Sequence, residues 1–542
     1  MKKSLKSLRL LFALLLVCVI VIAGCSKDNP ASSDGKVSSK GAMESYQAGE
    51  LFKATEEFDL SILYSDHPNY PYKKDWLFWE KLKEMTNVTL KPTTVPMSDY
   101  PQKRSLLMSS GDSPLIIPKT YPGEESAFVS SGAILPVSDY IDMMPNFKEK
   151  VQKWKLEDEL EGLRQNDGKY YLLPGLHEEV WPDYTLLMRT DILEENNLEI
   201  PTTWDELYET MKKLKEIYPD VIPFSDQFTF NSTLNVAAAG FGTKAGWGFG
   251  NGLSYDQSKD EFVYAATTNE YKDMLTYFHK LVEEELLDKE SFTQTDDQAI
   301  QKFVTGKSFI INGNSQTINL HRVDMDKTIG KGKYKIQKIT VPGGPAGQLM
   351  GGSRLENGVM ISSKIKESDY FKAILQFIDW LYYSDEGQEF AKWGVEGTTY
   401  TKSDGTRKLT EDVNYNGLNP TGTKDLRVDY GFSGGVFAYG GTTELLHSMM
   451  SEEEIKFQEN MANTKKVIPA EPPIPYTTED REKATLLSTP LKDFTDQNTL
   501  KFIIGSRSLS EFDQFVKELK TQGLDQYLEL SNKTYQDYKK NN

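Results

Sequence analysis

The segment that decides the fold is residues 169–207, KYYLLPGLHEEVWPDYTLLMRTDILEENNLEIPTTWDEL. It contains two short apolar runs, residues 170–173 and 185–188, which have the length and composition of buried strands. A Pro-Gly pair at residues 174–175 ends the first run, and a charged and aromatic segment leads to the second. Strands separated in this way are typical of a chain that crosses between two lobes, so we expect the residues of the crossing to lie in a cleft.

The preceding part of the chain alternates strand-like and helix-like segments. Residues 58–64, 88–92 and 115–118 have the pattern of strands, and helical segments lie between them. This order predicts an α/β unit with a parallel sheet and helices on both faces. Ligands of such sheets bind at the carboxyl ends of the strands, so the turns near residues 65–67 and 120–124 are candidate cleft loops.

The composition of the chain argues against several classes of function. There are 62 Lys and Arg residues against 80 Asp and Glu, a net charge of -18. A nucleic-acid partner is therefore not expected, because binding phosphates requires a basic patch. The same charge disfavours a polyanionic ligand, unless a local basic pocket overrides it. The two cysteines, Cys18 and Cys25, both precede the body of the protein, so no disulfide or Cys-based metal site is expected there.

The N-terminus has the features of a bacterial lipoprotein signal. Basic residues precede an apolar run, residues 10–22, that is too short to span a membrane comfortably. Residues 21–25, VIAGC, resemble a lipobox, in which the Cys is lipidated after cleavage. We therefore expect a signal peptide at residues 1–24, a lipid anchor at Cys25 with a linker through residue 54, and a body on the outer face of the cell membrane. The alternative is an ordinary secretory signal with a chance Cys.

The sequence offers little support for an enzyme. None of the five histidines has a second histidine four residues away, so a zinc site is not expected, and no cofactor is predicted. Residues 431–435, GFSGG, match the nucleophile-elbow string, but the Gly-rich run that follows does not look helical. Glu178 and Glu179 are adjacent on an extended chain and point to opposite sides, so they cannot flank one glycosidic bond. A glycoside hydrolase that uses a more distant carboxylate stays open.

A sugar-binding site requires fewer specialised residues than an active site does. Aromatic planes can stack on the C–H faces of a sugar ring, while carboxylates and amides bind its hydroxyls. Taken one by one, the same residues are explained equally well by packing and surface charge. The candidate ligand contacts are His177, Glu178, Glu179, Trp181 and Tyr184 in the crossing, Trp247 in a Gly-rich loop, Asn312, Asn314 and Gln316 at a turn, and Glu396, Tyr400 and Phe432 in later loops.

Several short motifs follow one another in a specific order and spacing. They are DGKYY at 167–171 with LP at 173–174, PTTWDEL at 201–207, TGK at 305–307 with ING at 311–313, YSDEG at 383–387, GVEG at 394–397 with Tyr400, and FIIG at 502–505. Together they resemble the extracellular solute-binding proteins of family 1, the group that includes maltose-binding protein. The similarity is greatest to the large lipoprotein members that bind alginate oligosaccharides.

This resemblance implies a fold with two lobes, each a mainly parallel sheet flanked by helices, hinged around a central cleft. The expected lobes are residues 55–174 with 343–394, and residues 175–342 with 395–542. Alginate-binding members carry a calcium loop after the helix that follows the PTT motif. Residues 218–223, YPDVIP, are too short and too poor in ligands for that role, so we expect no calcium there.

The resemblance also implies a function. We expect a monomeric, lipid-anchored, non-enzymatic receptor that closes on an oligosaccharide and delivers it to an ABC permease in the membrane. A receptor of the same fold for another solute, such as a peptide, and a secreted glycoside hydrolase are the alternatives. The sequence does not name the sugar, its length or its charge, nor the permease.

Overall fold

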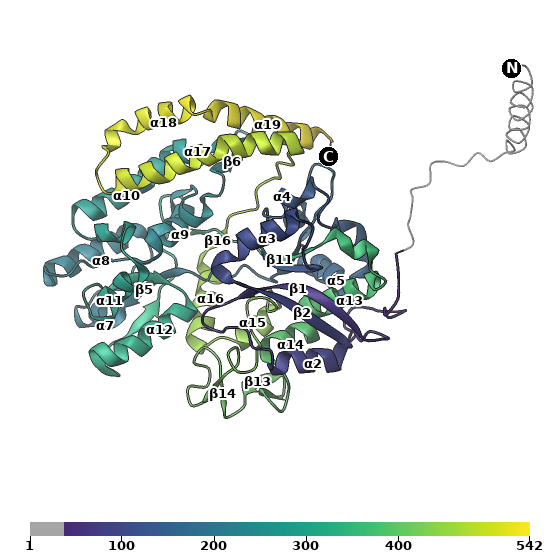
Figure 1. Ribbon diagram of the computed structural model, residues 1–542. Coiled ribbons are helices and arrows are strands. Elements are labelled where there is room, and N and C mark those ends of the chain that lie inside the picture. The colour runs from purple at the N-terminus through teal and green to yellow at the C-terminus, as the bar shows by residue number, and fades with distance from the viewer. Residues whose placement is uncertain (1–36, 542) are drawn as a thin grey trace, which may run out of the picture. The chain divides into compact units, whose positions relative to one another are not determined.

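The computed structural model describes residues 37–541 (Figure 1). The predicted signal peptide and Cys25 lie outside the described residues. Residues from Ser39 onward form one compact unit with two main β-sheets, each covered by helices, and with four two-stranded pairs. Among the helices of the described region, none is both long and apolar enough to cross a membrane.

The first lobe is built on a five-stranded sheet in the order β2-β1-β3-β11-β4. β1 pairs in parallel with β2 and with β3, while β11 is antiparallel to both β3 and β4. Four strands therefore run the same way, and only β11, which follows the return from the second lobe, runs against them. The strands are β1 (Phe58–Asp66), β2 (Val88–Pro96), β3 (Ile116–Thr120), β4 (Leu173–Leu176) and β11 (Leu355–Ile361).

Helices with strongly apolar faces cover this sheet. Every residue of α13 except Lys372 is buried, because the helix packs against β4 and against neighbouring helices at once. A helix that is apolar on all sides can only be stable inside a core. The helices of this lobe are α2 (Leu77–Thr86), α3 (Tyr100–Ser109), α4 (Ser126–Val129), α5 (Pro145–Trp154), α6 (Glu157–Glu161), α13 (Phe371–Tyr383) and α14 (Asp385–Trp393).

The second lobe contains the sheet β8-β5-β9, in which β5 (Thr185–Arg189) is antiparallel to both neighbours. β8 (Ile310–Gly313) and β9 (Ile336–Lys338) are therefore parallel to each other, and helix α12 (Ser315–Met325) connects them. Single parallel bridges from Phe224 extend the sheet beyond β8. The expected two-lobed α/β fold is confirmed. The first sheet is mainly parallel, as expected, whereas the three strands of the second sheet pair antiparallel. In each lobe, the strand that runs against its neighbours, β11 or β5, is the one that follows a crossing from the other lobe.

Long amphipathic helices complete the second lobe. α10 packs against α9 and α17, and the pair α17 and α19 lies along the lobe together with α18 (Figure 1). The helices are α7 (Thr190–Glu195), α8 (Trp204–Ile217), α9 (Asn231–Phe241), α10 (Asn269–Glu283), α11 (Asp296–Val304), α17 (Thr478–Ile503), α18 (Phe512–Thr521) and α19 (Leu524–Asn541), with a hairpin of β6 (Leu253–Asp256) and β7 (Glu261–Tyr264).

The segment between α14 and α16 differs from the expected lobe assignment, which placed residues 395–441 in the second lobe. Phe432 is fully buried, and its ring lies 5.6 Å from Phe78 and 5.3 Å from Phe390, both in the first lobe. The aromatic run around it packs in the same way, because its rings fill the space beside α2. The elements that follow α14 are β12 (Tyr400–Ser403), β13 (Thr406–Leu409), β14 (Val413–Asn414), β15 (Lys424–Asp425), α15 (Thr443–Ser448), α16 (Glu452–Thr464) and β16 (Lys466–Val467), which pairs with β10 (Leu349–Met350).

Candidate ligand-binding cleft

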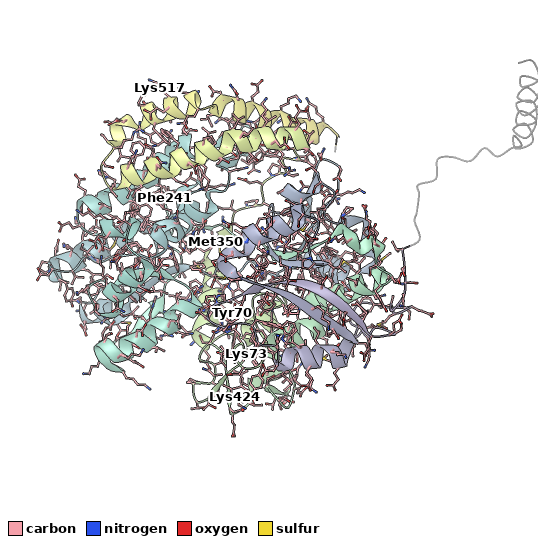
Figure 2. All side chains as sticks on the ribbon, in the orientation of Figure 1. Tyr70, Lys73, Phe241, Met350, Lys424 and Lys517 are labelled. Atoms are coloured by element: carbon pink, nitrogen blue, oxygen red, sulfur yellow. The ribbon has the colours of Figure 1, made fainter. Side chains whose placement is uncertain are left out.

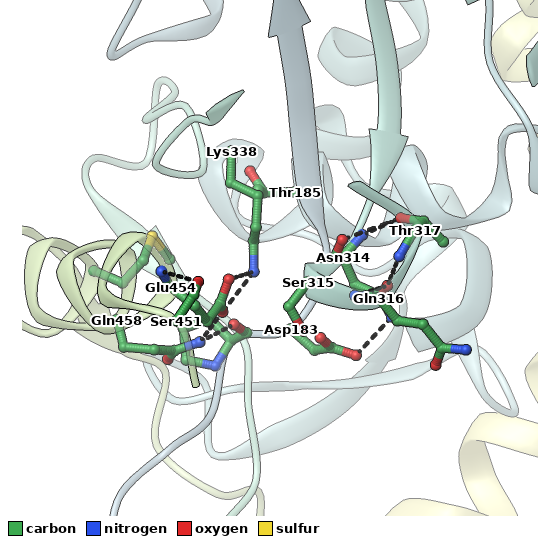
Figure 3. Close-up of polar contacts among 12 residues, drawn as sticks. Asp183, Thr185, Asn314, Ser315, Gln316, Thr317, Lys338, Ser451, Glu454 and Gln458 are labelled. Carbon is green, nitrogen blue, oxygen red and sulfur yellow. Dashed lines mark hydrogen bonds and ion pairs between the residues drawn. The ribbon is translucent and has the colours of Figure 1, made fainter. Parts of the chain in front are cut away.

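Three connections join the lobes: the first crossing between β4 and β5 (residues 177–184), the second connection between β9 and β11 (residues 339–354), and a third that contains α16 (residues 442–477). They meet at one polar network. Lys338, at the end of β9, donates to both carboxylate oxygens of Glu454 on α16, at 2.8 and 2.9 Å. The two side chains are only 3% and 6% exposed. The amide of Gln458 donates to Glu454 and to the carbonyl of Pro182 in the first crossing, both at 2.8 Å (Figure 3). A buried ion pair therefore joins β9 to α16, and Gln458 joins α16 to the first crossing.

Asp183 joins this network to helix α12. Its Oδ2 accepts a hydrogen bond of 3.1 Å from the amide of Asn314 (Figure 3). The Oδ1 of Asn314 in turn accepts from the backbone N–H groups of Gln316 and Thr317, which caps the helix. Burial raises the pKa of Asp183, while the charge of Lys338 and the bond from Asn314 oppose that rise.

An aromatic group stands beside the first crossing. The ring of Tyr184 lies 5.2 Å from Trp247 and 5.9 Å from Phe228, and the last two are 5.3 Å apart. Trp247 remains 49% exposed. Phe228 was not among the predicted residues, and it reaches this position through three successive residues with positive φ, from Phe228 to Phe230. Such a backbone is strained for side chains of this size, and the sequence gives no signal of it.

Trp181 stands between two cavities. The larger, about 570 Å³, is lined by Trp181, Asp183 and Tyr184 and by residues of α9, of the second connection and of α16. Met350, labelled in Figure 2, belongs to this lining. The smaller cavity, about 100 Å³, lies among Trp181, helix α12 and residues 415–416 of the first lobe's loops. The larger cavity falls in the size range of small-molecule sites, and it is lined by residues of the second lobe and of the segments that connect the lobes.

His177 anchors the start of the crossing instead of facing open space. It is 8% exposed, and its Nε2 lies 2.9 Å from Oε2 of Glu356 on β11. Burial works to raise the pKa of Glu356, but its bonds to His177 and to the N–H of Gly440 outweigh that effect and leave the pKa below its ordinary value. The His177 ring is also 6.0 Å from Trp181, so it supports the orientation of that side chain.

The carboxyl end of the first lobe's sheet carries a second group of side chains that the residue predictions missed. His67 stacks on Tyr70 at 4.1 Å, and the guanidinium of Arg427 lies 5.2 Å from the Tyr70 ring and 5.1 Å from the Tyr415 ring. Lys119, near the end of β3, has a φ of 54°. The predicted cleft turns near residues 65–67 and 120–124 adjoin this group, but nothing in the local sequence pointed to Arg427.

The structure brings together about half of the predicted site residues. Glu178 lies near the others and accepts a 2.8 Å bond from the N–H of Thr443, while Glu179 is exposed. Gln316 is half-buried in the first turn of α12. His177, Trp181, Tyr184, Trp247 and Asn314 gather around the crossing, as described above.

Four predicted residues lie elsewhere. Asn312 is fully buried in the second lobe, where its Oδ1 accepts from the hydroxyl of Ser232, because β8 turns this side chain into the core. Tyr400 is 5% exposed and donates to Glu389, and Glu396 is exposed in the turn before it. Phe432 packs in the first lobe's core. These positions combine polar or aromatic character with a structural role, which composition alone could not separate from ligand binding.

The described residues form neither a nucleophile elbow nor a metal site. The GFSGG string at residues 431–435 leads into turns and not into a helix. Within residues 37–541, no three His, Cys, Asp or Glu side chains are grouped so that they could hold a metal ion. The expected lack of calcium at residues 218–223 stays a prediction.

Comparison with known proteins supplies the family. The model of the bacterial extracellular solute-binding proteins matches residues 78–417. The polygalacturonan/rhamnogalacturonan-binding protein YtcQ of Bacillus subtilis is 26% identical, over 86% of this chain and 88% of its own. The fructooligosaccharide ABC transporter substrate-binding protein FusA of Streptococcus pneumoniae is 23% identical, over 97% of this chain and 98% of its own.

Among solved structures, the alginate-binding protein AlgQ2, crystallised without calcium ion, superposes with a TM-score of 0.68. The match covers 90% of this chain and 99% of AlgQ2, at 19% identity. At that identity the likeness establishes the two-lobed fold and not the ligand.

Proposed function

This chain belongs to the bacterial extracellular solute-binding proteins, the non-catalytic substrate-binding components of ABC transporters, and from that premise we propose that its ligand is an oligosaccharide. The observation that carries the proposal is the position of Trp181 between two cavities, with Tyr184 and the carboxylate of Asp183 beside it. An indole plane can stack on a sugar ring, and the neighbouring polar groups can bind its hydroxyls. The names of YtcQ and FusA refer to polysaccharides or oligosaccharides, which supports the same ligand class.

The mechanism that we propose is closure of the lobes about the three connections. A ligand that contacts both lobes binds the closed state more tightly and so shifts the population toward it. The buried pair of Lys338 and Glu454 holds the connections in register while the lobes move. The membrane permease would then recognise the closed form.

A binding panel tests the ligand class. The mature protein is titrated calorimetrically with oligosaccharides and, as the alternative, with short peptides. Trp181→Ala should weaken binding of the sugar by roughly 10- to 100-fold, because a stacked and buried ring contact is lost. Leu106→Ala, at a 60% exposed position on α3, is the matched control and should bind normally. Binding of peptides alone, or unchanged sugar affinity in Trp181→Ala, would contradict the proposal.

We also propose that lipidation of Cys25 holds the protein on the outer face of the cell membrane. The proposal rests on the lipobox-like residues 21–25. Diacyl anchoring supplies enough buried chain for stable attachment. Cys25→Ala should release the protein from the membrane fraction of an expressing bacterium, and continued membrane association of this variant would disprove the anchor.

A further inference from the structure

A group of basic side chains lies where the parallel strands of the first lobe end. Its two cationic side chains are Lys119 and Arg427, and both lie near Tyr70, which is labelled in Figure 2. A Cβ added to Gly435 would lie 3.2 Å from the Lys119 ammonium and 3.3 Å from the Tyr70 hydroxyl. The Lys119 ammonium and the Tyr70 hydroxyl therefore converge beside the backbone of Gly435.

Within the described part of the chain, the Lys119 ammonium has no ionic partner, and Arg427 has only a long ion pair, with Asp425. Among the described residues, the Lys119 ammonium makes no hydrogen bond or ion pair, and burial lowers its pKa. The buried Nε of Arg427 has no hydrogen-bond partner in the same part of the chain, and the nearest carboxylate oxygen, on Asp425, is 3.8 Å away. A partly buried cation without a partner is costly, and an anion that arrives with a ligand would offset the cost.

The carboxylates near Lys119 and Arg427 already accept hydrogen bonds from other groups. Asp66 accepts from the N–H of Tyr72 at 2.7 Å, and Asp425 accepts from two backbone N–H groups, at 2.8 and 3.0 Å. Glu356, whose charge acts on Lys119, is bonded to His177 and to the N–H of Gly440. Because Asp66, Asp425 and Glu356 accept hydrogen bonds from these other groups, N–H donors of Lys119 and Arg427 remain available to a ligand.

The basic group adjoins the proposed sugar site. The guanidinium of Arg427 donates to the side chain of Asn416 at 3.0 Å and packs on Tyr415. Asn416 and Tyr415 both line the smaller cavity, on the side of Trp181 away from the larger one. A sugar stacked on Trp181 would therefore have neighbouring rings near Arg427.

We infer that the ligand is an acidic oligosaccharide, rich in uronic acid, whose carboxylate is bound by Lys119 and Arg427 while another of its rings stacks on Trp181. The inference rests on the proposed function and adds the charge of the ligand to it. The net charge of -18 disfavours anions over the whole surface, and this local pocket is what overcomes it. YtcQ and FusA do not decide the matter, because YtcQ is named for acidic polysaccharides and FusA for a neutral oligosaccharide.

The test compares one sugar with and without its charge. The protein is titrated with galacturonic acid oligomers of two to six residues, with the same oligomers as methyl esters, and with neutral fructooligosaccharides. Binding of the acids should exceed binding of the esters by roughly 10- to 100-fold, since the ester cannot form charge-assisted hydrogen bonds. Lys119→Gln and Arg427→Gln should each remove most of that preference, and Lys119→Arg should restore part of it.

Lys73→Gln is the matched control, because Lys73 is exposed and already paired with Asp429 at 3.4 Å, and its preference for the acids should be that of the wild type. Equal binding of acids and esters, or tight binding of the neutral sugars alone, would overturn the inference and leave the proposed function intact. If no oligosaccharide binds, the proposed function fails and the inference falls with it. Should a variant not fold, the comparison of acid with ester on the wild type still decides.

Discussion

In the second lobe, burial and hydrogen bonding distinguish polar side chains that stabilise the fold from those that are free to bind a ligand. Asn312 was predicted as a ligand contact, yet its side chain is fully buried, and its backbone N–H donates to the fully buried carboxyl of Asp226 at 2.8 Å. The other oxygen of Asp226 accepts from the hydroxyl of Thr233 at 2.6 Å. This cluster lies inside the core behind the cleft, so it acts on stability and not directly on the ligand.

Asp226 makes stability depend on pH in an unusual direction. Burial raises its pKa from 3.8 to about 7, so the folded state holds this proton over a range in which the unfolded chain has lost it. The free energy of unfolding should therefore fall as pH rises from about 4 to about 7, by roughly 4 kcal/mol from this group alone. Asp226→Asn removes that contribution, and urea unfolding at pH 4.5 and pH 8 measures it.

The control for this prediction is Glu179→Gln, which removes a charge from an exposed position. It should keep the pH dependence of the wild type, to which other buried acids such as Glu125 also contribute in the same direction. An equal dependence on pH in the wild type and in Asp226→Asn would refute the assignment.

Among the elements, the three connections depend on the buried pair of Lys338 and Glu454. Removing one member of such a pair leaves an uncompensated charge, while replacing both by apolar groups costs little. Glu454→Gln should therefore lower the free energy of unfolding by about 3 to 5 kcal/mol. The double change of Lys338→Met and Glu454→Met should stay within about 1 to 2 kcal/mol of the wild type, as measured by chemical denaturation. A single variant as stable as the wild type would contradict this account.

The elements also show what the sequence could and could not predict. The strands on either side of Pro174 and Gly175 were predictable, because apolar runs and chain-breaking residues are local signals. The packing of residues around Phe432 on the first lobe was not, since it depends on rings at Phe78 and Phe390 that are distant in the sequence. Arg427 was missed for the same reason, and Phe228 because its position depends on a strained backbone.

At the scale of the whole molecule, the two-lobed fold was predicted correctly from the order of the motifs. In each lobe, one strand runs against the others, and in both cases it is the strand that follows a crossing, β5 or β11. The first crossing carries Trp181, Asp183 and Tyr184, which line the larger cavity. The central claim is that a sugar held there, against Trp181, draws the lobes together.

Small-angle X-ray scattering of the protein with and without a saturating oligosaccharide tests that claim most directly. The account predicts a smaller radius of gyration in the presence of the sugar, and no such change in Trp181→Ala at the same sugar concentration. A sugar that binds tightly and leaves the scattering of the wild type unchanged would contradict it.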